Sequence, residues 1–179
     1  MPFAIHLFFD PDTEAIIKTA WKKLAETGIA PYMHRSANRP HFSLAIYQSI
    51  HLAACEQKLQ SLSAAWQPLP VSFQSIGIFP TTPATVFLSS PVTTALLDLH
   101  AEVHQALHPT GIDPSQYYLP GKWVPHCTLA LDLEPGLLPQ VLKIGLQMPL
   151  PINGEITEIG AIEFRPVRHL FRFSLAPHP

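Results

Sequence analysis

Apolar and polar residues succeed one another along the chain in a way that predicts regular strands and helices. Residues 3–9 are almost all apolar and predict a buried strand. Asp10 and Pro11 are residue types typical of a helix N-cap and of the first helical position, and Gly28 is a suitable end. Between them the apolar positions recur at helical spacing and predict one buried face, formed by Ile16, Ile17, Ala20, Trp21 and Leu24.

Three more helices follow from the same periodicity. One is capped by Ser49, one is opened by Ser90 and Pro91, and a weaker one spans residues 137–147, which include Pro139. The buried positions expected in the first two are Leu52, Cys55, Leu59, Leu62 and Trp66, and Leu96, Leu99, Val103 and Leu107. Further strands are expected at residues 41–47, 71–79, 84–89 and 126–133, with a final pair within 155–175.

The order strand, helix, strand, helix, strand occurs twice, and Pro80 to Pro83 lie between the two copies. This repetition predicts an α+β protein with two similar lobes that form a single domain over residues 1–179. The repeated halves are approximately residues 1–82 and 83–179. The segment before the strand at 126–133 is a loop of roughly fifteen residues, a length typical of binding loops in compact domains.

The composition limits the classes of function. Of the 179 residues, 47% are hydrophobic and 13% are Asp, Glu, Lys or Arg, and the formal net charge is −2. A protein that coats nucleic acid needs clustered Lys and Arg, so we expect a local cleft for a short or terminal substrate instead.

The cysteines and the N-terminal segment bear on location. Cys55 and Cys127 lack the paired spacing of a metal site or a disulfide framework, which suits a reducing cytoplasm. The first apolar run is interrupted by His6 and stopped by Asp10, which indicates a strand and not a signal sequence. No segment approaches the ~20 apolar residues of a membrane helix, so a soluble cytoplasmic protein is expected.

One short motif occurs twice. Residues 40–45 are PHFSLA and residues 125–130 are PHCTLA, displaced by 85 residues, the difference between positions 41 and 126. Four of the six positions are identical, and threonine replaces serine at a fifth. Strand alternation predicts that each copy places its histidine and hydroxyl on one exposed face with alanine next. The expected faces are His41, Ser43, Ala45 and Tyr47 in the first copy, and His126, Thr128 and Ala130 in the second.

The paired imidazoles and hydroxyls are suited to chemistry at phosphorus. In-line attack on a phosphodiester needs a base for the incoming oxygen and an acid for the departing one, and two histidines provide both without a metal. The hydroxyls can donate hydrogen bonds to the non-bridging phosphate oxygens. A single His-x-Ser or His-x-Thr is common, and a lone histidine in a strand usually has only a structural hydrogen bond. Two copies in matching strand contexts favour a catalytic site.

At these residues the sequence resembles the 2H phosphoesterase superfamily, which includes 2′-5′ RNA ligase and cyclic nucleotide phosphodiesterase enzymes and is marked by paired His-x-Ser/Thr motifs. The resemblance covers nearly the whole chain. It implies antiparallel sheets flanked by helices, with His41, Ser43, His126 and Thr128 as a catalytic tetrad in a central groove. It further implies that His126 activates the nucleophile and His41 protonates the leaving oxygen when a 2′,3′-cyclic phosphate is opened, and that these roles exchange when a 2′-5′ link is made.

Substrate contacts are expected from the loop before the second motif and from the residue before the first. Lys122 is a candidate phosphate contact or a solvated loop lysine. Tyr117, Tyr118 and Trp123 are candidates for base stacking, although we expect one of these three to fill the core instead. Arg39, two residues before His41, is a further candidate for the phosphate.

Two other basic groups leave alternatives open. His100, His104 and His108 recur at the four-residue spacing of some metal sites, but no carboxylate shares their stripe, which favours a partly exposed helix face. Arg165, Arg168 and Arg172 suit either phosphate binding or the protection of an edge strand.

The sequence thus predicts a phosphoesterase with no metal, no cofactor and no membrane association, acting on RNA ends or small nucleotides that carry a cyclic phosphate. The direction of reaction and the oligomeric state stay open, with a monomer as the simplest expectation. The rival hypotheses are a non-catalytic nucleotide- or RNA-binding module on the same fold, and a structural interaction protein.

Overall fold

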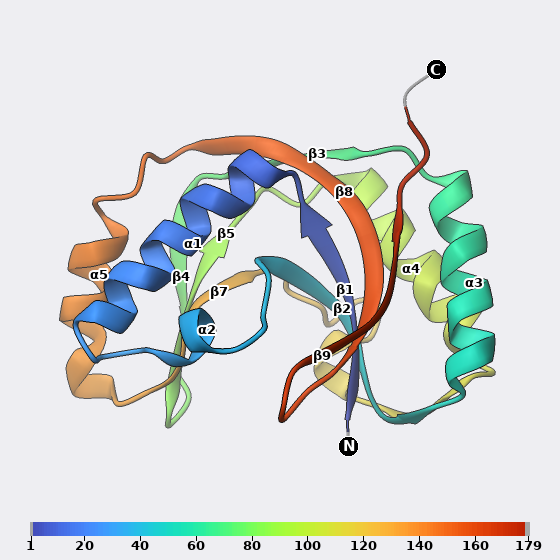
Figure 1. Cartoon of the computed structure of the whole chain (residues 1–179), viewed down its shortest axis with the longest axis horizontal. Helices are drawn as coiled ribbons and strands as arrows, with labels where there is room; N and C mark the ends of the chain where they lie inside the picture. Colours follow the sequence, from blue (N-terminus) through green and yellow to red (C-terminus); the bar gives the residue numbers. More distant parts are fainter. Residues whose placement is uncertain (1, 178–179) are drawn as a thin grey trace.

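The computed structural model describes residues 2–177 and alternates strands with helices along the chain (Figure 1). Its helices are α1 (Pro11–Glu26), α2 (Tyr32–Arg35), α3 (Leu52–Ala65), α4 (Thr94–Leu107) and α5 (Leu138–Gly145). Its strands are β1 (Phe3–Phe9), β2 (His41–Ile50), β3 (Leu69–Phe73), β4 (Ser75–Phe79), β5 (Ala84–Ser89), β6 (Gly111–Pro114), β7 (Cys127–Leu133), β8 (Ile152–Glu163) and β9 (Arg168–Ser174).

Two antiparallel sheets form the centre of the molecule. Within residues 2–177, one sheet has six strands, ordered β3-β8-β1-β2-β6 with β9 also paired to β8, and the other has three, ordered β4-β5-β7. The long strand β8 curves across the first sheet (Figure 1). The α+β class with antiparallel sheets is therefore confirmed.

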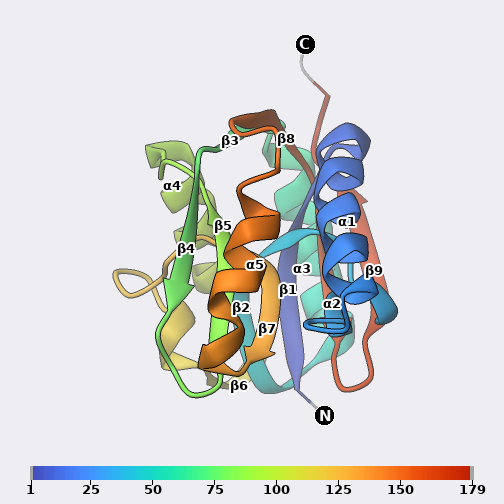
Figure 2. The ribbon, with the colours of Figure 1, turned by 90° about the vertical axis from the view of Figure 1, so that its left-hand side faces the viewer.

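The helices lie in two groups on opposite sides of the strands. α1 and α5 lie together on one side with α2 close by, and α3 and α4 lie together on the other (Figures 1 and 2). α1 begins as the sequence predicts, because the Asp10 carboxylate accepts a hydrogen bond from the Thr13 amide at 2.9 Å and Pro11 occupies the first turn. Gly28, just beyond the end of this helix, has a φ of +74°, a conformation that glycine adopts without strain.

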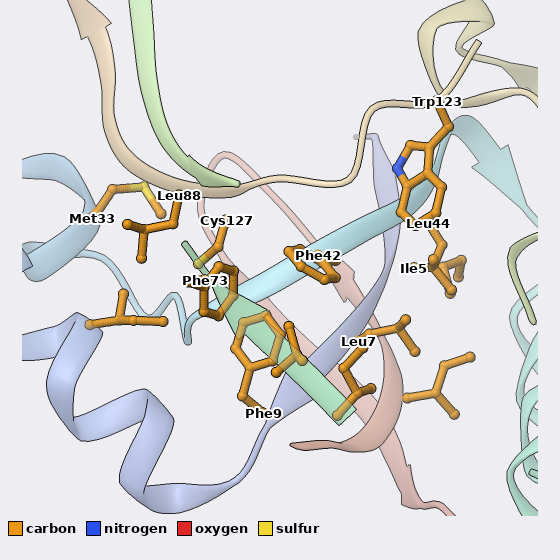
Figure 3. Close-up of a cluster of buried hydrophobic side chains, with 14 of the residues drawn as sticks. Ile5, Leu7, Phe9, Met33, Phe42, Leu44, Phe73, Leu88, Trp123 and Cys127 are labelled. Carbon is orange, nitrogen blue, oxygen red and sulfur yellow. The ribbon is translucent and has the colours of Figure 1, made fainter. Parts of the chain in front are cut away.

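One continuous core joins the two sheets and both helix groups. At its centre the rings of Phe9, Phe42 and Phe73 meet edge to face, with centroids 5.1 to 5.6 Å apart (Figure 3). The predicted buried faces of α1 and α4 pack here, except that Ile16 is only partly buried. On α3, Cys55 and Leu59 are buried, whereas Leu52 is 40% exposed. Cys55 and Cys127 are both buried and unpaired.

Some predicted boundaries were wrong. Residues 71–79 are not one strand, because β3 pairs with β8 and β4 pairs with β5 in the other sheet. Ser49 lies within β2, and the α3 N-cap is His51, whose Nδ1 accepts from the Ala54 amide. α4 is capped by Thr93 and begins three residues after Pro91.

The sheets do not follow the two halves of the chain. β6, β8 and β9 come from the second half but join β1, β2 and β3, and β4 from the first half joins β5 and β7. The division near residues 82 and 83, within the β4–β5 hairpin, stays a prediction about the repeat. Among the described residues no helix has the length and apolar character needed to cross a membrane.

Candidate active site

The two motifs come from different sheets and meet at one cavity. His41 begins β2 in the six-stranded sheet, and His126 immediately precedes β7 in the three-stranded sheet. The starts of these strands adjoin, since the Cys127 thiol contacts the His41 backbone. All four predicted tetrad residues, His41, Ser43, His126 and Thr128, line the same cavity of about 540 Å³. The structure thus brings together the groups that the repeated motif predicts.

Both motif strands are bulged at equivalent positions. In the β1–β2 pairing, Ile5 faces Ala45 but the next residue, His6, faces Ser43, so Leu44 is an extra residue. In the β5–β7 pairing, Val86 faces Ala130 and Phe87 faces Thr128, so Leu129 is the extra one.

After Ser43 and Thr128 the bulges reverse the side-chain alternation, so the predicted faces of the residues that follow were wrong. Because an extra residue reverses the alternation, Ile46 and Leu131 line the cavity. Ala45, Tyr47 and Ala130, which were expected on the cavity face, are buried in the core.

Each motif histidine is fixed by a backbone carbonyl two residues earlier. Nδ1 of His41 lies 2.6 Å from the Arg39 oxygen, and Nδ1 of His126 lies 2.7 Å from the Val124 oxygen. A carbonyl only accepts, so Nδ1 carries the proton in both rings. When neutral, each ring therefore has Nε2 unprotonated and available to the cavity, the arrangement that a general base requires.

Burial shifts both histidines towards their neutral forms. Burial is the main cause that lowers the pKa of His41 from 6.5 to about 4; the Arg39 carbonyl opposes this shift, and the charges on His126 and His169 add to it. Burial also lowers the pKa of His126, although the Val124 carbonyl opposes this shift. Neither ring is held protonated when the cavity is empty at neutral pH.

A third histidine, His6, distinguishes the two halves of the site. Its ring is stacked on His41 with centroids 3.7 Å apart and planes 8° from parallel, and it is 3% exposed. The equivalent neighbour of His126 is Phe87, which meets that ring at 5.4 Å and 61°. Sequence reasoning gave His6 no role, because a lone histidine in a strand has no recognisable spacing to a partner.

We expect His6→Ala to lower kcat by about 10- to 100-fold, because loss of the stacked ring frees His41 to rotate from its position. Water entering the space should also raise the pKa of His41, so the acidic limb of the rate profile moves to higher pH. His6→Phe retains a flat, apolar ring and should retain most of the rate. Equal loss in both variants, with an unchanged pH profile, would contradict a positioning role for the ring.

The loop before His126 brings to the cavity the residues that were predicted as candidate substrate contacts. Tyr117, Tyr118, Lys122 and Trp123 all line the cavity. Tyr117 is 73% exposed and has a free face, whereas Trp123 is 9% exposed and belongs to the core (Figure 3). Trp123 is therefore the aromatic that fills the core. Its indole donates a hydrogen bond to the backbone carbonyl oxygen of Ser43 at 2.8 Å, which also holds the first motif in place.

Arg39 lies elsewhere, contrary to the prediction. Its guanidinium is held by Glu14 at 2.7 Å and Glu158 at 2.6 Å, and it lies over the Phe8 ring at 4.5 Å. It is absent from the residues that line the cavity, although its carbonyl fixes His41. The side chain is engaged in ion pairs, so it is not available to a phosphate. No local pattern predicts these ion pairs, because both carboxylates are distant along the chain.

Two histidines of the α4 stripe, His100 and His104, bind backbone oxygens of the segments that line the cavity. Nε2 of His100 lies 2.8 Å from the backbone oxygen of Tyr118 and 3.1 Å from that of Leu44. Nε2 of His104 lies 3.0 Å from the same Leu44 oxygen. The His100 ring is stacked on Trp123 at 4.1 Å. His100 is 2% exposed and packs with the partly buried His104 against β2 and the loop before His126, whereas His108 is exposed, so the stripe is partly exposed as expected.

Comparison with known proteins places the chain in a family. The family described as the 2′-5′ RNA ligase superfamily matches residues 10–166, and the chain belongs to it. No curated protein sequence matches.

Solved structures share the fold. Escherichia coli LigT in complex with 3′-AMP is 17% identical, with a TM-score of 0.63 over 98% of this chain and 99% of that one. The TT0787 protein of Thermus thermophilus is also 17% identical, with a TM-score of 0.65 over 100% of both chains. The resemblance to the 2H phosphoesterases inferred from the repeated motif is confirmed.

Proposed function

We propose that the chain is a metal-independent phosphoesterase that opens 2′,3′-cyclic phosphates, or makes and breaks 2′-5′ phosphodiester links, on RNA ends or nucleotides. The observation that carries this proposal is the pair of imidazoles at one cavity, each with Nδ1 bound to a carbonyl and Nε2 left for proton transfer. Membership of the superfamily is consistent with such chemistry.

In the proposed hydrolysis a water oxygen attacks phosphorus while one histidine takes its proton at Nε2. The bond from phosphorus to a ribose oxygen breaks, and the second histidine, protonated at Nε2, gives its proton to that oxygen. Ser43 and Thr128 donate hydrogen bonds to the non-bridging oxygens. Because both rings are held alike, the assignment of His126 as base and His41 as acid stays a prediction, and the reverse reaction exchanges the roles.

Turnover of the four 2′,3′-cyclic mononucleotides in the presence of EDTA tests the proposal. We expect hydrolysis that EDTA does not reduce, and the product, a 2′- or a 3′-phosphate, identifies the bond that breaks. A 2′-5′-linked dinucleotide is assayed beside them to test the second activity. Binding of nucleotides without turnover of any substrate would favour the binding-module hypothesis.

The pH dependence is expected to be bell-shaped, with the maximum of kcat/KM below pH 6.5. The rate requires one neutral and one protonated imidazole, so the maximum lies between the two pKa values of the free enzyme. Burial lowers both pKa values from 6.5. The rate should therefore fall as pH rises through the higher of them. A maximum above pH 7, measured at constant ionic strength, would contradict the lowered pKa values.

A further inference from the structure

A second hollow, of about 550 Å³, adjoins the catalytic cavity. Tyr32, Arg165 and Val167 line both spaces, so they form the wall between them. Arg35, at the end of α2, lines only the second hollow. The hollow thus lies within reach of a ligand that already occupies the catalytic cavity.

This hollow holds the arginines that lack a partner. Arg39, Arg168 and Arg172 each lie within 4.0 Å of a glutamate oxygen. Among residues 2–177, Arg35 and Arg165 have neither an ion pair nor a side-chain hydrogen bond, and both face the same space. Both arginines are exposed to solvent, and two unpaired guanidiniums that line one hollow are suited to an anion.

The surrounding charges leave this site positive. Asp132 also lines the hollow, but it forms no ion pair with either arginine in the part of the chain that the structure describes, so one positive charge remains in excess. Arg165 has a φ of +68°, in the left-handed region that non-glycine residues rarely adopt. The turn between β8 and β9 therefore presents an arginine at a position that glycine would occupy with less strain.

Tyr32 gives the two spaces a common wall with a flat face. The side chain is 42% exposed and contributes to both linings. A ribose or base lying against it would lie between the cavity that the two motif histidines line and the hollow that the two arginines line. A planar guanidinium can donate two parallel hydrogen bonds to two oxygens of one phosphate, which suits Arg35 and Arg165 to a second phosphate.

We propose that Arg35 and Arg165 bind a second phosphate of the substrate, attached to the ribose 5′ oxygen, across Tyr32 from the catalytic site. This rests on the proposed function, because it assumes that the catalytic cavity binds a phosphate at the 2′ or 3′ position. The substrate class is then a nucleotide with phosphates at both ends of its ribose. A free 5′-phosphorylated nucleotide and the last residue of an RNA chain, whose 5′ oxygen carries a phosphodiester, share this chemistry.

Binding of product-like ligands tests the second site without requiring turnover. Dissociation constants are measured by titration calorimetry for adenosine 3′-monophosphate and for adenosine 3′,5′-bisphosphate. We expect the intact protein to bind the bisphosphate at least about tenfold more tightly, with a preference that shrinks at high salt. In Arg35→Gln the ratio of the two constants should fall close to one. Arg165→Gln should weaken both ligands, because Arg165 lines both spaces.

Arg172→Gln is the matched control, because it removes one positive charge from outside both hollows and should keep the tenfold ratio. A ratio near one in the intact protein, or an unchanged ratio in Arg35→Gln, would overturn the second site. A dinucleotide ending in a 3′-phosphate, titrated alongside, distinguishes an RNA end from a free nucleotide by whether it binds more or less tightly than the bisphosphate. Turnover of unmodified cyclic mononucleotides, assayed in parallel, tests the proposed function separately.

Discussion

Replacing either motif histidine by alanine is expected to lower kcat for 2′,3′-cyclic nucleotides by about 100- to 10,000-fold. His41 and His126 line the same cavity, and each is held through Nδ1 by a backbone carbonyl. Loss of one ring removes either the proton acceptor or the proton donor, and within residues 2–177 no other imidazole at the cavity is held through Nδ1 by a backbone carbonyl. KM should change little, because the truncated group acts mainly in the transition state.

The double variant provides a sharper form of this experiment. If the two rings act as one unit, His41→Ala combined with His126→Ala should cost about as much as either single change. His34→Ala is the control, since His34 is exposed and does not line the cavity, and it should keep the full rate. Full activity in His126→Ala would rule out the two-histidine mechanism.

Trp21→Ala is expected to destabilise the protein by about 3–5 kcal/mol, the largest effect on stability that we predict. The side chain is 2% exposed within the main core, and its indole donates a hydrogen bond to the backbone carbonyl oxygen of Thr128 at 2.9 Å. Truncation therefore leaves a cavity beside α1 and a carbonyl without its donor in the second motif strand. Urea unfolding followed by circular dichroism measures the change.

Trp21→Phe separates the two contributions. It keeps most of the buried ring and loses the hydrogen bond, so a smaller cost of about 1–3 kcal/mol is expected. The rate should also fall in Trp21→Phe, because the carbonyl belongs to the residue that carries a motif hydroxyl. A Trp21→Ala protein within 1 kcal/mol of the original would contradict the tight packing of this ring.

The sequence was sufficient to predict that His41, Ser43, His126 and Thr128 meet at one cavity, because the motif that carries them is repeated. PHFSLA and PHCTLA each place a histidine and a hydroxyl at a spacing that survives in both sheets. Local caps such as Asp10 were predictable for the same reason, since donor and acceptor lie three residues apart. Local reasoning was not always sufficient, because the caps of α3 and α4 are His51 and Thr93 and not the residues expected from the sequence.

The errors concern partners that are distant along the chain. Arg39 looked free because Glu158 is 119 residues away, and the run at 71–79 looked continuous because its two parts pair with different strands. The bulges at Leu44 and Leu129 break the alternation on which the face of Tyr47 was predicted. His6 was overlooked because its stack on His41 arises only when β1 lies beside β2.

The paired bulges have a consequence for the products. Ile46 and Leu131 take equivalent places after two equivalent histidines, so the two motifs line the cavity with matching side chains. A small phosphodiester could enter in two orientations related by a half-turn, and each would present a different ester oxygen to the proton donor. In the proposed reaction we therefore expect the regiochemistry of cleavage, 2′ or 3′, to depend on the groups that differ between the two motifs, such as His6 beside His41, Phe87 beside His126, and the single Arg165.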